Sequence, residues 1–188
     1  MKTIFIRVAL PVLISAMLFS CEKKDNEPSD GSGNLKIGNQ SYSLTSGTIW
    51  NYGEDDSFDE NYEGYELSLS LYSNGLSENG WDNYVGSGLY LTCEIYSASR
   101  DAFVEEEYEF RSYILNSFPA GTFTYSGYGR FNDSDENDYS WNDITAGTIT
   151  INKEGDTYTV SINCANASGE EVSGTYTGKL SYGYPPSE

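Results

Sequence analysis

The chain has no histidine and only three cysteines among its 188 residues. Without histidine it lacks the commonest general base, the Ser-His-Asp triad and the ligand of most zinc sites. No G-x-S-x-G motif, phosphate-binding loop or C-x-x-C motif is present. A pair of carboxylates can hydrolyse glycosides, but a chain with 29 acidic residues does not single out one pair. The sequence therefore predicts a protein that is not an enzyme, with a carboxylate-dependent glycoside hydrolase as a minor alternative.

Positive charge is also scarce, because ten basic residues stand against 29 acidic ones and give a net charge of −19. Nucleic acids and anionic lipid headgroups are bound mainly through Lys and Arg, so the composition argues against both as partners. An acidic surface of this kind favours solubility and suits cations or neutral polymers as ligands.

The chain lacks a hydrophobic run long enough to span a bilayer. Its longest apolar stretch covers residues 8–19, is interrupted by Pro11 and Ser15, and follows Lys2 and Arg7. As a helix it would measure about 18 Å, whereas a bilayer core is about 30 Å thick. A short basic start followed by a short apolar segment is typical of a secretory signal peptide. We therefore predict that residues 1–20 are a signal peptide and exclude them from the fold.

The segment Leu18-Phe19-Ser20-Cys21 resembles the lipobox of bacterial lipoproteins, in which the cysteine becomes the first residue and carries a diacylglycerol. Residues 23–27, Lys-Lys-Asp-Asn-Glu, resemble the charged export tag of Bacteroidetes lipoproteins, which can direct them to the cell surface. The resemblance implies lipidation at Cys21 and an outer-membrane anchor that exposes the protein at the cell surface. A periplasm-facing anchor and an ordinary signal peptide with a chance cysteine remain the alternatives.

The segment after Cys21 is rich in Ser, Gly and charge, which predicts a flexible tether over residues 21–33. Removal of residues 1–20 takes away two basic residues and no acidic one, leaving eight against 29 and a net charge of −21. The remaining residues, 34–188, have the length of a single domain.

Strict alternation of apolar and polar residues dominates the rest of the chain, and no long window has a helical period. Residues 65–72 place Tyr65, Leu67, Leu69 and Leu71 on one face, and residues 88–96 and 157–164 repeat the pattern. One-sided alternation is typical of antiparallel sheets. We predict an all-β, antiparallel β-sandwich of about nine strands that ends in a meander over residues 147–182. A closed, lipocalin-like β-barrel is the alternative, since alternation does not separate the two.

The last 40 or so residues, with "GTITINKEGDTYTVSI" and "GTYTGKL", resemble small secreted β-domains of Bacteroidetes envelope lipoproteins that have no known function. This resemblance implies an all-β domain and carries no information about a ligand.

Cys93 and Cys164 both fall on faces that alternation turns inward. In an oxidising cell envelope they can form a disulfide that closes a long loop. They can equally pack as two separate thiols, because pairing needs a Cα separation below about 7 Å.

Two acidic segments, residues 54–61 and 132–143, lie between predicted strands. Asp133, Asp135 and Asn137 have the spacing of the first three calcium ligands in an EF-hand loop. The sixth position is Asp138 rather than Gly, and the twelfth is Ile144 rather than Glu. The sequence thus leaves open a looser Ca²⁺ site or solvated loops without a metal, and it predicts no other cofactor.

The chain has 17 tyrosines and three tryptophans. Trp50, Trp81 and Trp141 each lie next to Asn or Asp, and alternation turns Tyr72, Tyr90 and Tyr96 outward; these six residues form the predicted ligand-binding set. Rings stack on sugar faces while amides and carboxylates bind hydroxyls, so the set favours a glycan-binding module. The alternatives are purely structural aromatics and an assembly lipoprotein that binds an outer-membrane protein partner.

Overall fold

The computed structural model describes residues 31–52, 62–81, 83–104, 106–115, 117–135 and 139–185. The predicted signal peptide, the lipidation site at Cys21, most of the tether and the acidic segment 54–61 lie outside the described residues. The first strand begins at Ser32, two residues before the predicted start of the domain.

The described part of the chain is built almost entirely of β-strands. The elements are β1 (Ser32–Ile37), β2 (Gln40–Asn51), β3 (Tyr62–Glu63), β4 (Tyr65–Ser73), β5 (Leu76–Glu78), β6 (Tyr84–Ser97), β7 (Glu107–Phe110), the 3₁₀ turn η1 (Tyr113–Leu115), β8 (Phe118–Pro119), β9 (Thr122–Asn132), β10 (Ser140–Glu154), β11 (Thr157–Asn166), β12 (Glu171–Gly178) and β13 (Ser181–Gly183). Among the described residues, no helix is long and apolar enough to cross a membrane.

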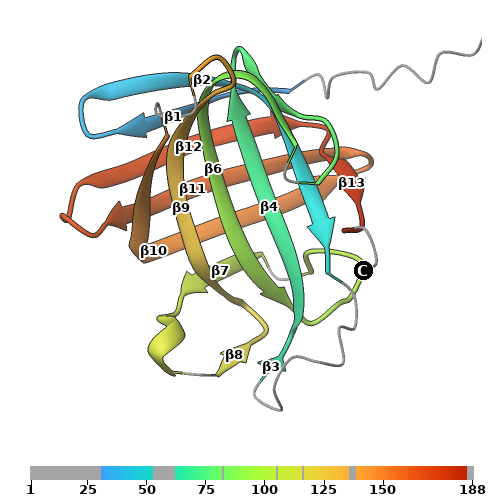
Figure 1. Cartoon of the computed structure of the whole chain (residues 1–188). Helices are drawn as coiled ribbons and strands as arrows, with labels where there is room; N and C mark the ends of the chain where they lie inside the picture. The colour runs from blue at the N-terminus through green and yellow to red at the C-terminus, as the bar shows by residue number, and fades with distance from the viewer. Residues whose placement is uncertain are drawn as a thin grey trace, which may run out of the picture.

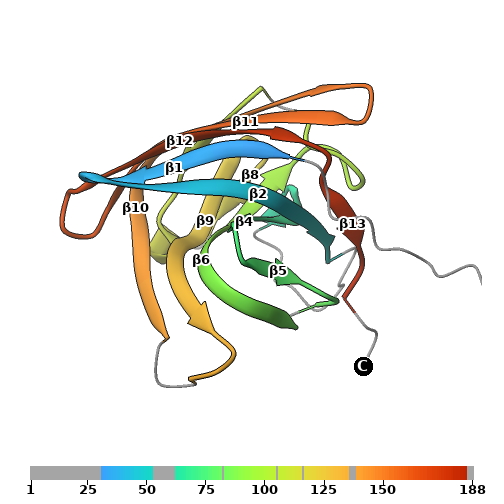
Figure 2. The same cartoon turned by 90° about the horizontal axis from the view of Figure 1, so that it is seen from above.

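Nine strands close into a barrel in the order β1-β12-β11-β10-β7-β9-β6-β4-β2 (Figures 1 and 2). The ring closes because β1 pairs with two neighbours: Leu35 lies opposite Gly174 of β12 and opposite Tyr42 of β2. Strand β7 lies between β9 and β10 at one end of the barrel. At the other end, β9 and β10 pair directly with each other.

The predicted all-β class is confirmed, and so is the C-terminal meander, which is formed by β10, β11 and β12. The predicted sandwich is wrong, and the closed barrel offered as the alternative is correct. The error has a simple physical origin. Inward and outward residues alternate in the same way in both architectures, and only the pairing of β1 with both β2 and β12, which closes the ring, distinguishes them.

The barrel interior is a continuous apolar core. Leu67, Leu69 and Leu71 from β4 are fully buried, as the alternation predicted. Tyr65, which belongs to the same predicted face, lies at the start of the strand and is exposed. The central positions are therefore predicted better than the strand ends, where the barrel opens to solvent.

Cys93 and Cys164 are both in this core, but as free thiols, so the structure does not contain the disulfide that the sequence left open. Burial raises the pKa of the Cys164 thiol to about 11 and that of Cys93 still further. Both thiols therefore behave as small apolar side chains.

Candidate functional site

The outer face of strands β2, β4, β6 and β9 carries rows of polar side chains. Register places Thr48, Ser70 and Thr92 side by side across β2, β4 and β6. The next row contains Trp50, Ser68 and Glu94, with Thr124 of β9 directly across from Glu94. Side chains at directly opposed positions share a face, so these rows form one continuous polar floor.

Aromatic rings bound the floor at both ends. Tyr72 and Tyr90 lie opposite each other on one side, and Tyr96 lies on the other. All three point outward as predicted, yet they are buried; Tyr72, for example, is 1% exposed. Tyr96 stacks on Phe118 with 5.0 Å between the ring centroids.

Strand β5 and the segment that follows it explain the burial of Tyr72 and Tyr90. The described residues of this segment, 76–81, 83 and 84, are called here the flap. Its strand β5 pairs with the start of β6, and its apolar residue Leu76 packs with both tyrosines. Tyr84 from the end of the flap lies 5.4 Å from Tyr90 and 6.2 Å from Tyr72, measured between ring centroids. The flap thus covers part of a face that alternation alone describes as wet.

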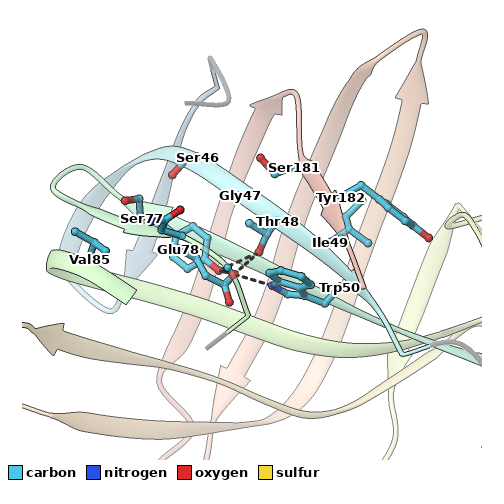
Figure 3. Close-up of a pocket in the computed structure, with 14 residues that line it drawn as sticks. Ser46, Gly47, Thr48, Ile49, Trp50, Ser77, Glu78, Val85, Ser181 and Tyr182 are labelled. Carbon is cyan, nitrogen blue, oxygen red and sulfur yellow. Dashed lines mark hydrogen bonds between the residues drawn. The ribbon is translucent and has the colours of Figure 1, made fainter. Parts of the chain in front are cut away.

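Glu78 joins the flap to the floor. Its Oε2 accepts hydrogen bonds from the Thr48 hydroxyl at 2.9 Å, from Trp50 Nε1 at 2.7 Å and from the Tyr72 hydroxyl at 2.5 Å (Figure 3). Burial, followed by the nearby charge of Glu78, raises the pKa of Tyr72, which keeps its hydroxyl protonated as a donor. The carboxylate therefore fixes the orientation of the Trp50 ring.

Two cavities open between the flap and the floor, and they share Trp50 and Glu78. The larger, called here the outer cleft, has a volume of about 630 Å³ and lies between β2, the flap and β13 (Figure 3). The smaller, called here the aromatic pocket, has a volume of about 160 Å³. It is lined by Trp50, Tyr52, Ser68, Ser70, Glu78, Trp81, Tyr84, Thr92, Glu94 and Tyr125.

A β-bulge brings Tyr125 to the aromatic pocket. Thr92 pairs with Gly127 and Glu94 with Thr124, so β9 has one residue more than β6 in this interval. Tyr125 has a φ of +37°, the only positive value among the non-glycine residues that the structure describes. Bulges re-aim side chains next to functional sites, and strained φ values concentrate there. Tyr125 is half exposed and stacks on Tyr113 at 5.2 Å.

Two carboxyl groups lie close together on the floor. Glu66 pairs with Tyr96, and Glu94 pairs with Ser68, which makes the two acids diagonal neighbours on β4 and β6. Burial raises the pKa of Glu66 to about 7. Burial, with the charge of Glu66 as a second cause, raises the pKa of Glu94 to about 8.

The six residues of the predicted ligand-binding set all lie on this outer face, but only some of them reach a cavity. Trp50 and Trp81 line the aromatic pocket, and Tyr72 lines the outer cleft. Tyr90 and Tyr96 are buried beneath other rings. Trp141 lies outside both linings, 5.9 Å from the Tyr90 ring and above Gly127, where a Cβ would come within 2.4 Å of the Trp141 ring.

Sequence reasoning missed Glu78, Glu94, Tyr84 and Tyr125 as residues of the site. Glu94 offered a usable signal, because it is a carboxylate at an outward position between the outward residues Thr92 and Tyr96 of a strongly alternating strand. Glu78 and Tyr84 offered none, since their role depends on the flap folding back over the sheet. Tyr125 is two residues from the buried Phe123, so plain alternation puts both on the same face, and the bulge instead brings Tyr125 to the aromatic pocket.

The predicted calcium loop is described only in part, because Asn137 lies outside the described residues. Asp133 accepts hydrogen bonds from the Gly86 backbone and the Ser134 hydroxyl, and the Asp135 backbone donates to Asn132. In the described ranges, no group of three His, Cys, Asp or Glu side chains is arranged to hold a metal ion.

The site therefore combines hydroxyl and carboxyl groups on a floor with aromatic rings on the walls, under a flap tied down by Glu78. Such a surface can hold a polar ligand that also has apolar faces. No protein-family model, no curated protein and no solved structure matches this chain.

Proposed function

We propose that the protein is a non-enzymatic binding module that holds a saccharide in the outer cleft and the aromatic pocket. The observation that carries this proposal is the combination of a floor of Ser, Thr and Glu side chains with lining rings from Trp50, Trp81, Tyr84 and Tyr125. Sugars present C–H faces that stack on rings and hydroxyls that bind to carboxylates and hydroxyls. The outer cleft has the volume of a site for a small oligosaccharide, within the 300–1,000 Å³ usual for ligand pockets.

The test compares two tryptophans on the same outer face of the protein. Trp81 lines the aromatic pocket and is 40% exposed, whereas Trp141 lies outside both cavities and is 37% exposed. A glycan-array screen identifies a ligand, and titration calorimetry then measures its affinity. Trp81→Ala should weaken binding at least tenfold, as expected for a central aromatic contact, and Trp141→Ala should change it less than twofold. Equal losses from both variants, or no binding to any bacterial, host or dietary glycan, would refute the proposal.

We further propose that this module is an envelope lipoprotein anchored through Cys21, as the lipobox resemblance implies. Metabolic labelling with palmitate should mark the wild-type protein and not Cys21→Ala. Protease treatment of intact cells should degrade a surface-exposed protein and spare a periplasm-facing one. A wild-type protein that takes up no label would exclude the anchor.

A second candidate function is binding of an outer-membrane protein partner, and the exposed turn η1 favours it. Its three residues, Tyr113, Ile114 and Leu115, are all more than half exposed. Large exposed apolar groups in consecutive positions often belong to protein interfaces. Cross-linking in intact cells should lose a specific adduct in an Ile114→Asp, Leu115→Asp variant, while the Trp81→Ala variant should retain it.

The hydrolase alternative depends on Glu66 and Glu94. Their diagonal positions are compatible with the spacing of a carboxylate pair, but Glu94 lines the aromatic pocket whereas Glu66 lines neither that pocket nor the outer cleft. Release of new reducing ends from a bound glycan, abolished by Glu94→Gln, would replace the binding proposal with hydrolysis.

A further inference from the structure

The aromatic pocket has an unusual balance of charge for a saccharide site. Glu78 and Glu94 both line it, and Glu66 is a diagonal neighbour of Glu94 on the same face. None of the described residues that line either cavity is Lys or Arg. Ionisation of both Glu66 and Glu94 would bring two like charges into repulsion at a buried place, and no basic side chain in these linings compensates them. An anionic ligand would add to this repulsion, whereas a cation would relieve it.

The walls of the pocket favour the same sign of charge. Trp50, Trp81, Tyr84 and Tyr125 all line a space of only about 160 Å³. Aromatic rings attract cations through the negative potential of their faces, and cages of several rings are the common way of holding an ammonium group. The volume is below that of a site for a drug-sized molecule, so the pocket can take one small group of a larger ligand.

A polar group without a hydrogen-bond partner lies next to Glu94, although it is not part of the pocket lining. The side chain of Thr124 is fully buried, and its Oγ1 has no hydrogen-bond partner in the structure. It lies directly across from Glu94 on the same face of the sheet. A buried hydroxyl normally accepts or donates at least one hydrogen bond, so this one leaves an unsatisfied polar group beside the buried acid Glu94.

The acidic lining and the aromatic walls of the pocket agree on one ligand chemistry. We infer that the aromatic pocket binds a protonated amine of the saccharide, which makes an amino sugar with a free amine the preferred ligand class. The ammonium group lies among the rings and donates hydrogen bonds to the Glu94 carboxylate. The remainder of the sugar chain extends into the outer cleft past Trp50 and Glu78, which the two cavities share. This inference rests on the proposed saccharide-binding function and specifies its ligand.

The test uses disaccharides of β-1,4-linked glucosamine, the same disaccharide with both amines acetylated, and cellobiose. Titration calorimetry measures their affinities for wild-type protein at 0.15 M salt. The free-amine form should bind at least tenfold more tightly than the acetylated form. Glu94→Gln removes the charge but keeps the shape of the side chain, and it should reduce that ratio to below twofold.

Two controls separate specific binding from general attraction to an acidic protein. Glu154→Gln removes one charge from the exposed β10–β11 hairpin and should leave the tenfold ratio unchanged. Trp81→Ala should weaken binding of the free-amine form. A thermal melt of each variant verifies that it is folded, which is expected for Glu94→Gln because the change replaces a buried acid with a neutral amide of the same shape.

The outcomes distinguish the inference from the proposed function. If the acetylated disaccharide or cellobiose binds as tightly as the free amine, the amine inference is wrong and the saccharide-binding function stands. If Glu94→Gln and Glu154→Gln reduce the ratio equally, the attraction is non-specific and the inference is again wrong. If no disaccharide binds and the glycan array is also silent, both proposals are wrong.

Discussion

Both faces of strands β4 and β6 are buried, but the inner face is apolar and the outer face is polar. The inner face presents Leu67, Leu69 and Leu71 to the barrel core, where apolar packing stabilises the fold. The outer face presents Ser68 and Ser70, which are also buried, at 6% and 4% exposed. The comparison teaches that alternation assigns residues to faces and does not decide which face is dry. On the outer face, the residues are buried because the flap covers them.

The largest expected effect is the difference in free energy of unfolding between alanine substitutions at adjacent positions, one on the inner face and one on the outer face. Leu69→Ala removes a fully buried side chain from the core and should lower the free energy of unfolding by about 3–4 kcal/mol. Ser70→Ala removes a hydroxyl that donates to Thr92 at 3.0 Å, and its cost should be about 1 kcal/mol. Urea denaturation followed by tryptophan fluorescence measures both changes. Similar costs at the two positions would mean that the outer face is also a packed core.

A second effect comes from the buried acid on the outer face. The pKa of Glu94 is raised to about 8 in the folded protein from 4.5 in the unfolded chain, so between these pH values the folded state binds more protons. The contribution of Glu94 to the free energy of unfolding is therefore fully present below pH 4.5 and is lost as the pH rises through 8. Above pH 8 this contribution changes little. Glu94→Gln should have little effect at pH 4 and should stabilise the protein at pH 9 by an amount on the order of 2 kcal/mol.

The control for this prediction is Glu154→Gln on the exposed hairpin, which removes the same formal charge from the surface. Thermal melts of both variants across pH 4–9 provide the measurement. Parallel pH profiles for the two variants would show that the loss at high pH reflects the overall negative charge and not the burial of Glu94.

The same comparison explains which features the sequence could predict. Residues 65–72 and 88–96 alternate so regularly that their strands, their inner faces and their outward tyrosines follow from local pattern. The closure of the barrel depends on β1 meeting β12, a contact between residues that are far apart in sequence and carry no complementary signal. The site depends on Glu78 folding back onto Thr48, Trp50 and Tyr72, which is equally non-local. Local periodicity therefore predicts strands and faces, whereas pairing partners and coverings need tertiary structure.

The smallest predicted effect concerns Tyr125, where a local irregularity overrides alternation. Its φ of +37° is unfavourable for any residue with a Cβ and readily adopted by glycine. Tyr125→Gly should therefore be more stable than Tyr125→Ala by about 1 kcal/mol, although alanine is normally preferred over glycine within strands. At the exposed strand position Thr159, where φ is not positive, the alanine variant should be the more stable of the two.

Both Tyr125 variants remove the same ring from the aromatic pocket, so both should weaken saccharide binding to a similar extent whatever their stability. Urea denaturation and titration calorimetry on the two variants thus separate the backbone role of the position from its role in binding. A Tyr125→Gly variant that is less stable than Tyr125→Ala would mean that the bulge stores no strain. Retention of full affinity in either variant would mean that the bulge has some purpose other than presenting this ring to a ligand.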